Sequence, residues 1–154
     1  MVGRHADRLA HFPPQGTSSY GCHAVHTPER DWVEVVRGLF PEGVRVFVDT
    51  VGSIAETERG LPAMARYGHI VSAGFYGSED QLPLQPPRYS ELSIHLVSGM
   101  TPDRLTRTLG LVAAGHLQTL PLITHRFPVT QAAAAWRLIE TRTEPVLGVV
   151  LDWP

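Results

Sequence analysis

The pattern of hydrophobic and polar positions in residues 43–77 predicts a strand, a helix and a second strand. Two β-rich runs, 44–48 and 69–73, each end in small and Gly-containing residues. Between them, Ser53-Ile-Ala-Glu has the spacing of a helix capping box, and Gly68 stands where a helix commonly ends. Two strands joined by a helix predict a βαβ unit, in which the strands are parallel and the crossover is right-handed.

The same patterns predict the other elements of the chain. A short helix is expected within 3–11, Pro62 should interrupt the helix of the βαβ unit, and the proline-rich stretch 78–90 is expected to be a loop. Further strands are predicted at 22–25, 92–97, 122–127 and 146–151, and helices that begin at Thr27, Thr101 (ending at Gly115) and Thr130. Alternating strands and helices indicate an α/β fold with a mostly parallel sheet.

Composition and charge exclude several classes of protein. The 154 residues suit one domain of ordinary size, and a net charge of -2 gives no electrostatic basis for binding nucleic acid or an anionic membrane. No apolar run approaches the roughly 20 residues of a membrane span. Cys22 is the only cysteine, which precludes a disulfide within one chain and favours a reducing, cytoplasmic compartment.

Four segments carry a resemblance to a known family. They are Leu-Ile-Thr-His-Arg-Phe-Pro-Val at 122–129, the alanine run ending in Trp at 132–136, Val-Val-Leu-Asp-Trp at 149–153 and Ala-Gly-Phe-Tyr at 73–76. The first two resemble the carboxyl-terminal part of the medium-chain dehydrogenase/reductases, the zinc-type alcohol dehydrogenase superfamily. The last two resemble its bacteriochlorophyllide a dehydrogenase-like branch. The resemblance covers nearly the whole chain.

This resemblance implies a partial Rossmann fold and an oxidoreductase. Residues 1–120 would form an incomplete nucleotide-binding domain, and 121–154 the segment that returns to the substrate domain. The sequence contains no G-x-G-x-x-G, which the family places upstream of Met1, so the first strand and the Gly-rich turn would be missing. The chain is then expected to be an inactive fragment of an NADP-dependent enzyme that interconverts alcohols and carbonyls by hydride transfer. The alternatives are a non-catalytic nucleotide-binding remnant or interaction module, and a small α/β protein of different function.

The resemblance also implies where the cofactor would bind. Gly3 replaces the acid that holds the adenosine ribose in the family, and Arg4 beside it favours the 2′-phosphate of NADP, with NAD as the alternative. A solvated basic terminus would explain the same residues. The other implied cofactor contacts are Thr50, Val51 and Gly52 along the adenosine, Ala73, Gly74 and Phe75 near the nicotinamide, and Ser98 at the next strand end. Ordinary strand-end turns remain the alternative for all of these positions.

Catalytic and metal-binding residues are not identified by the sequence. Tyr76 is either a proton donor to a carbonyl substrate or a packed aromatic residue, and His125 matches a structural position of the family. Cys22, His23 and His26 form a loose cluster without a fourth ligand, so no zinc is expected in this chain.

Without the first Rossmann strand, the predicted sheet would lack its central strand. In the family order 3-2-1-4-5-6, the strand 22–25 would have no neighbour linking it to 44–48. Three outcomes are expected: it takes the empty central place, it detaches as a loop, or two chains pair their exposed edges. The family commonly dimerises through the strand that corresponds to 92–97, so the resemblance implies a homodimer.

Overall fold

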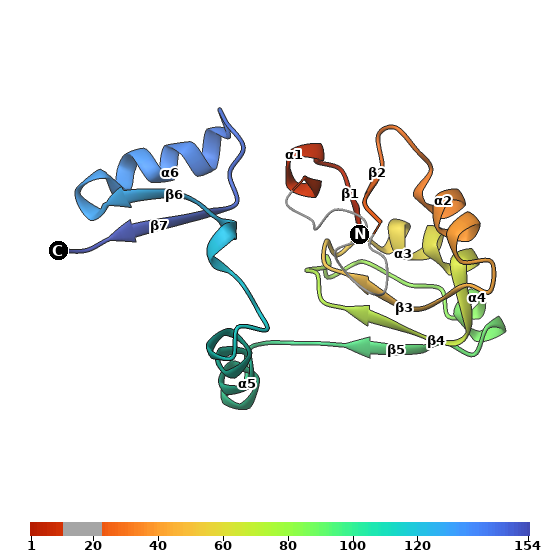
Figure 1. The fold of residues 1–154 in the computed structure, drawn as a ribbon. Helices are drawn as coiled ribbons and strands as arrows, with labels where there is room; N and C mark the ends of the chain where they lie inside the picture. The colour runs from red at the N-terminus through yellow and green to blue at the C-terminus, as the bar shows by residue number, and fades with distance from the viewer. Residues whose placement is uncertain (11–22) are drawn as a thin grey trace. The chain divides into compact units, whose positions relative to one another are not determined.

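The computed structural model describes residues 1–10 and 23–154, which fall into two compact units (Figure 1). The described part of unit 1 is residues 1–4 and 23–99, and that of unit 2 is residues 5–10 and 100–154. Each unit has its own parallel strands, and each is described by itself below. No helix formed by the described residues is long and apolar enough to cross a membrane.

Unit 1 is built on a three-stranded parallel sheet in the order β3-β4-β5 (Figure 1). The strands are β3 (Val44–Asp49), β4 (Met64–Ser72) and β5 (Ser93–Leu96). Phe47, Ile70 and Ile94 stand side by side in the register of the three strands. The predicted parallel βαβ unit is therefore confirmed, and so is the α/β fold class.

A separate two-stranded parallel pair joins β1 (Val2–Gly3) to β2 (Val25–His26). The amide of Val25 donates to the carbonyl of Met1 at 2.9 Å, and that of Thr27 to Gly3 at 3.0 Å. Among the described residues no strand ladder joins this pair to β3. Two of the three expected outcomes, that β2 would take the empty central place or detach as a loop, were wrong, because β2 pairs with β1. The pairing of two chains through their exposed edges stays a prediction.

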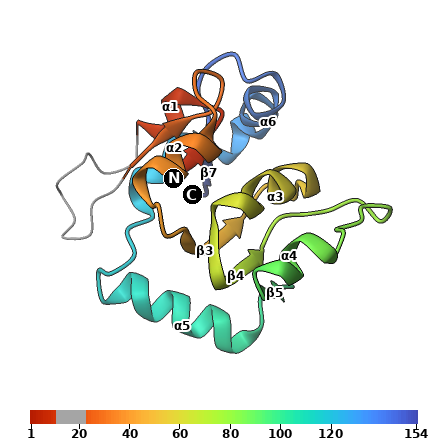
Figure 2. The same ribbon diagram turned by 90° about the vertical axis from the view of Figure 1, so that its right-hand side faces the viewer.

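Two helices of unit 1, α2 (Trp32–Leu39) and α3 (Ile54–Gly60), lie beside β3 and β4 (Figure 2). The predicted start of α2 at Thr27 was wrong, since the carboxylate of Asp31 accepts the amide of Val33 and caps the helix four residues later. For α3 the N-cap at Ser53 was predicted correctly, because its hydroxyl accepts the amide of Glu56 at 3.2 Å. The reciprocal half of the capping box is not formed, since the amide of Ser53 donates to Asp49.

The end of α3 differs from the prediction. Pro62 interrupts the helix as expected, and a 3₁₀ turn, η1 (Leu61–Ala63), follows Gly60. Because a proline has no amide hydrogen to donate, it ends the helical ladder before Gly68. Gly68 is instead buried inside β4, where an added Cβ would lie 2.9 Å from the carbonyl oxygen of Ala65.

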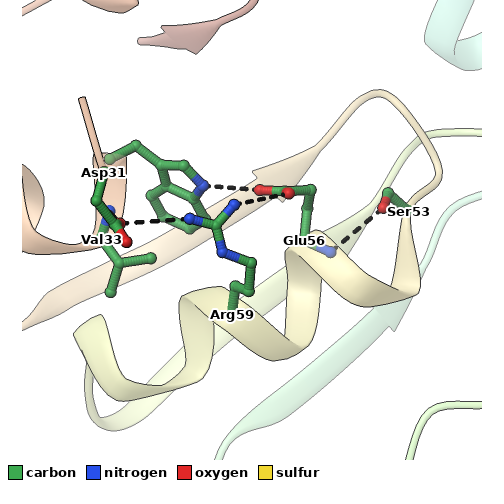
Figure 3. Close-up of polar contacts among 6 residues, drawn as sticks. Asp31, Val33, Ser53, Glu56 and Arg59 are labelled. Carbon is green, nitrogen blue, oxygen red and sulfur yellow. Dashed lines mark hydrogen bonds and ion pairs between the residues drawn. The ribbon is translucent and has the colours of Figure 1, made fainter. Parts of the chain in front are cut away.

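Polar contacts connect the start of α2 to side chains along α3 (Figure 3). The indole nitrogen of Trp32 donates to Glu56 at 2.7 Å, and Arg59 contacts both Glu56 at 2.9 Å and Asp31 at 3.4 Å. The buried indole also stacks on Phe47 of β3, with ring centroids 5.9 Å apart. These contacts fix the two helices against the strand whose carboxyl end carries several predicted site residues.

The stretch 78–90 contains a five-residue helix, α4 (Gln85–Tyr89), where a loop was predicted. Pro86 and Pro87 occupy its first turn, where helical amides have no partner in any case, so these prolines favour a helix start.

Unit 2 contains a second pair of parallel strands, β6 (Ile123–Pro128) and β7 (Gly148–Asp152). Its helices are α1 (Ala6–Leu9), α5 (Pro102–Ala113) and α6 (Ala132–Thr141), with 3₁₀ turns η2 (Leu120–Leu122) and η3 (Val129–Gln131). Thr101 caps α5 as predicted, and Gly115 follows its end at φ +73°. Thr130 does not cap α6, because it lies within η3 and the N-cap position is the next residue, Gln131.

Candidate functional site

The carboxyl end of β3 is organised by a buried carboxylate. Asp49, only 5% exposed, accepts hydrogen bonds from the amides of Val51 (2.8 Å), Gly52 (3.0 Å) and Ser53 (3.0 Å). Its second oxygen also accepts the hydroxyl of Tyr76 at 2.6 Å. Because Tyr76 follows β4 in the chain, this one side chain connects the loops after two neighbouring strands.

The hydrogen bonds stabilise the ionised form of Asp49. Burial favours the neutral acid, but the phenol and the three amides together outweigh burial and lower the pKa of Asp49 below its ordinary value of 3.8. Burial raises the pKa of Tyr76 above 10.0, and the hydrogen bond to Asp49 adds to the increase. The pair is therefore a carboxylate and a neutral phenol at neutral pH.

Two glycines bring the loops after β3 and β4 into direct backbone contact. A Cβ added to Gly74 would lie 2.1 Å from the amide nitrogen of Gly52, and one added to Gly52 would lie 2.0 Å from the carbonyl oxygen of Phe75. Gly52 also adopts φ +83°, a conformation that side chains disfavour. The amide of Ala73 donates to the carbonyl of Asp49 at 2.8 Å, which continues the ladder into these loops.

Six of the predicted cofactor residues are thus brought together in these two loops. Gly52 and Gly74 form the contact, whereas Thr50, Val51, Ala73 and Phe75 are exposed around it, Phe75 to 97%. Ser98 follows β5, next to Val97, whose amide donates to Ser72 at 3.1 Å. The structure therefore gathers residues from the ends of three neighbouring strands.

Gly3 and Arg4 lie at the carboxyl end of the separate β1–β2 pair. The carbonyl of Arg4 is within hydrogen-bond distance of Nε2 of His26, 3.1 Å away, and Nδ1 of the same ring is 3.1 Å from Glu29. The guanidinium of Arg4 belongs to an exposed residue. The described structure places this second group of predicted residues on a different sheet from the first.

Asp49 and Tyr76 were not predicted to act together. The motif Asp-Thr-Val-Gly-Ser contained the signal for Asp49, since an aspartate followed by small residues commonly accepts the amides of its own turn. For Tyr76 the structure supports the packed aromatic interpretation, because its hydroxyl already donates to Asp49. No local pattern could indicate that partner 27 residues away.

The remaining candidates have ordinary partners. His125 stacks on Phe127 and lies 2.8 Å from the hydroxyl of Thr124 and 3.3 Å from a carboxylate oxygen of Glu144. Of the loose metal-like cluster, Cys22 lies outside the described residues. In residues 1–10 and 23–154 no three His, Cys, Asp or Glu side chains converge to hold a metal ion.

A hollow of about 430 Å³ is lined by three residues of α2, Glu34, Arg37 and Gly38, and by Pro41, which follows the helix. None of the predicted cofactor residues contributes to it, so it does not identify the site.

Comparisons with known proteins identify the class to which this fold belongs. The sequence profile of the zinc-binding dehydrogenases matches residues 21–145, and the chain belongs to that family. It is 30% identical over 90 residues to the 2-desacetyl-2-hydroxyethyl bacteriochlorophyllide A dehydrogenase of Cereibacter sphaeroides, covering 58% of this chain and 28% of that protein. With the enzyme of the same name from Rhodobacter capsulatus it shares 26% identity over 141 residues, or 92% of this chain and 42% of that one.

The fold is also found among solved structures. The short chain alcohol dehydrogenase rspB of Escherichia coli CFT073, solved with its cofactor NADH, matches 98% of this chain and 43% of its own, with a TM-score of 0.80 and 19% identity. At that identity the match demonstrates the fold alone. The chain spans less than half the length of the curated relatives it matches. The resemblance to the carboxyl-terminal part of medium-chain dehydrogenases is confirmed.

Proposed function

We propose that this chain supplies part of the nucleotide-binding domain of an NADP-dependent oxidoreductase, which interconverts an alcohol and a carbonyl compound by hydride transfer. One observation carries the proposal. In a member of the zinc-binding dehydrogenase family, three parallel strands end together, and the loops after two of them are held by Asp49 with Thr50, Val51, Ala73 and Phe75 exposed. Open α/β sheets bind their ligands at such strand ends.

The residues of this edge would bind and orient the cofactor. The nicotinamide supplies the hydride when it is bound, whereas the protein holds it in place. Thr50, Val51 and Gly52 would lie along the adenosine side, and residues 73–75 with Ser98 near the nicotinamide.

Arg4 supports NADP over NAD. A guanidinium at the end of a strand can form paired hydrogen bonds with a phosphate, and the 2′-phosphate is what distinguishes the two cofactors. Gly3 beside it leaves no carboxylate for the ribose diol of NAD. The single cysteine, Cys22, is in keeping with a cytoplasmic enzyme.

Titration of the ¹⁵N-labelled chain with NADP⁺ and NAD⁺ tests the proposal. Amide shifts are expected at 50–53, 73–75 and 98, with a dissociation constant above the micromolar range, because these 154 residues contain no G-x-G-x-x-G turn to hold the pyrophosphate. The Arg4→Gln variant should weaken NADP⁺ binding at least fivefold and leave NAD⁺ unchanged. Arg45→Gln, at the amino end of β3, is the matched control. Shifts confined to other regions, or equal effects on both cofactors, would contradict the assignment.

A non-catalytic nucleotide-binding module is the second candidate. It is favoured by the state of Tyr76, whose hydroxyl is occupied by Asp49 and is not available to a substrate carbonyl. Steady NADPH consumption by the purified chain with a small aldehyde or ketone would exclude this candidate.

We also infer that a second copy of the chain pairs with β5. This strand is an edge of the three-stranded sheet, and its last residue, Leu96, is 82% exposed. An exposed apolar edge invites pairing with another chain, and a lysine on the edge opposes it. Light scattering should give twice the 16.9 kDa chain mass for the wild type and a monomer for Leu96→Lys, with Leu120→Lys, in unit 2, as the control. A monomeric wild type at high concentration would refute the dimer.

A further inference from the structure

The imidazoles of His69 and His95 meet on one face of the β3–β4–β5 sheet. Nδ1 of His69 lies 2.9 Å from Nε2 of His95, and the ring centroids are 5.1 Å apart. His69 of β4 pairs with Ser93 of β5, so His95 stands two residues further along the neighbouring strand. Because side chains two residues apart share a face of a strand, both rings project from the same side. Both histidines are exposed.

The spacing of the two nitrogens suits a shared cation. A neutral imidazole has one N–H and one bare nitrogen, so two facing ring nitrogens need a proton or a metal ion between them. Two imidazole nitrogens that bind one Cu²⁺ or Ni²⁺ ion at the right angle of a square-planar site, each about 2.0–2.1 Å from the metal, are about 2.9 Å apart, whereas the tetrahedral angle of Zn²⁺ sets about 3.3 Å. The distance observed between His69 and His95 is therefore also the distance that one chelated ion would set.

The strand residues beside His69 and His95 are uncharged, unlike the neighbours of two other histidines. His26 and His125 each face a glutamate carboxylate, at 3.1 and 3.3 Å. The strand neighbours of His69 and His95 in register are Val46, Ser93 and Val71, which carry no charge. These neighbours offer no carboxylate at the register positions, so the two imidazoles are the metal-ligating groups that these positions present.

We propose that His69 and His95 form a two-imidazole site for a divalent transition-metal ion, with water in the other coordination positions. Imidazole ligands suit Cu²⁺, Ni²⁺ and Zn²⁺, whereas Mg²⁺ prefers oxygen ligands. Affinity should follow the general order in which Cu²⁺ binds more tightly than Ni²⁺ or Zn²⁺. The site is independent of the proposed cofactor edge, because it uses neither the strand-end loops nor Arg4.

Metal titration of the untagged full chain tests this site in two ways. In the wild type, substoichiometric Cu²⁺ should broaden the amide signals of 69–71 and 93–95 before any others, and Mg²⁺ should leave them unchanged. Equilibrium dialysis should give one tightly bound Ni²⁺ per chain. His69→Gln and His95→Gln should each weaken that binding at least tenfold, since chelation needs both rings, and His116→Gln, an exposed histidine of unit 2, should not.

Two results would overturn the proposal. One is broadening centred on residues 23–26, which would place the metal on the other histidine cluster. The other is Ni²⁺ affinity that stays within twofold of the wild type in both sheet variants. The broadening experiment uses the wild type alone, so a variant that fails to fold does not prevent a decision.

Discussion

Replacing Gly74 with alanine is expected to lower the free energy of unfolding of unit 1 by about 3 kcal/mol, at the upper end of the cost of overpacking a well-packed site. The new Cβ would lie 2.1 Å from the amide nitrogen of Gly52 and 2.6 Å from its Cα. These atoms belong to backbone that is held in place by Asp49, so no flexible side chain can move aside to relieve the clash. The loops after β3 and β4 must separate instead.

Urea unfolding, followed through the amide signals of β3 and β4, measures this effect. Gly38→Ala in α2 is the matched control in the same unit, because the added Cβ would meet no atom within 4 Å beyond its chain neighbours and the backbone of its own helix. Alanine has the higher helix propensity, so this control should raise stability by up to about 1 kcal/mol. Equal stabilities for the Gly74 variant and the wild type would show that the two loops do not touch.

Replacing Asp49 with asparagine is expected to lower the free energy of unfolding of unit 1 by about 2–3 kcal/mol. Hydrogen bonds to a charged group contribute about 1.5–3 kcal/mol each, and asparagine keeps one acceptor oxygen but turns an NH₂ group toward the remaining donors. Tyr76→Phe removes one donor only and should cost about 1 kcal/mol. Asp80→Asn is the control. Asp80 is exposed, and within the described residues its carboxylate accepts the amide of Gly77 alone.

The stability difference between wild type and Asp49→Asn should depend on pH. The pKa of Asp49 is lowered in the folded protein, so folding favours the ionised form. The stabilisation is therefore complete above the unfolded pKa of 3.8 and is lost as the pH falls through the lower folded value. Denaturant unfolding between pH 2 and pH 7 should show the two curves converging only in the acid range. A constant difference at all pH values would mean that the charge of Asp49 does not matter.

If the Asp49 carboxylate holds the cofactor edge, its loss should also disturb the loops locally. Amide exchange in 51–53 and 74–76 should accelerate more than in the centre of β4, because local opening precedes global unfolding. The proposed function uses these loops as its binding surface, so the same variants connect stability with cofactor binding.

Several elements were determined by local sequence alone. The N-caps at Ser53 and Thr101 were predicted correctly, since a hydroxyl three residues before its amide partner needs no distant contact. The strands of the βαβ unit and the order β3-β4-β5 were also predicted, because consecutive parallel strands joined by a helix leave few other topologies. Pro62 ended its helix for an equally local reason, the missing amide hydrogen.

Other features were decided only by tertiary structure. Gly68 looked like a helix end in the sequence, yet it lies in β4, where the backbone of Ala65 approaches it closely. The contact of Gly52 with Gly74 and the bond of Asp49 to Tyr76 join residues 22 and 27 positions apart. Spacing rules report which residues share a helix face or a strand face, whereas these contacts depend on how two neighbouring strands are aligned. The sequence by itself therefore determined the family, the order of β3, β4 and β5, and the strand ends at which the cofactor edge is proposed. The alignment of β3 with β4, which only the tertiary structure shows, decided which residues of that edge hold the two loops together and which are merely exposed there.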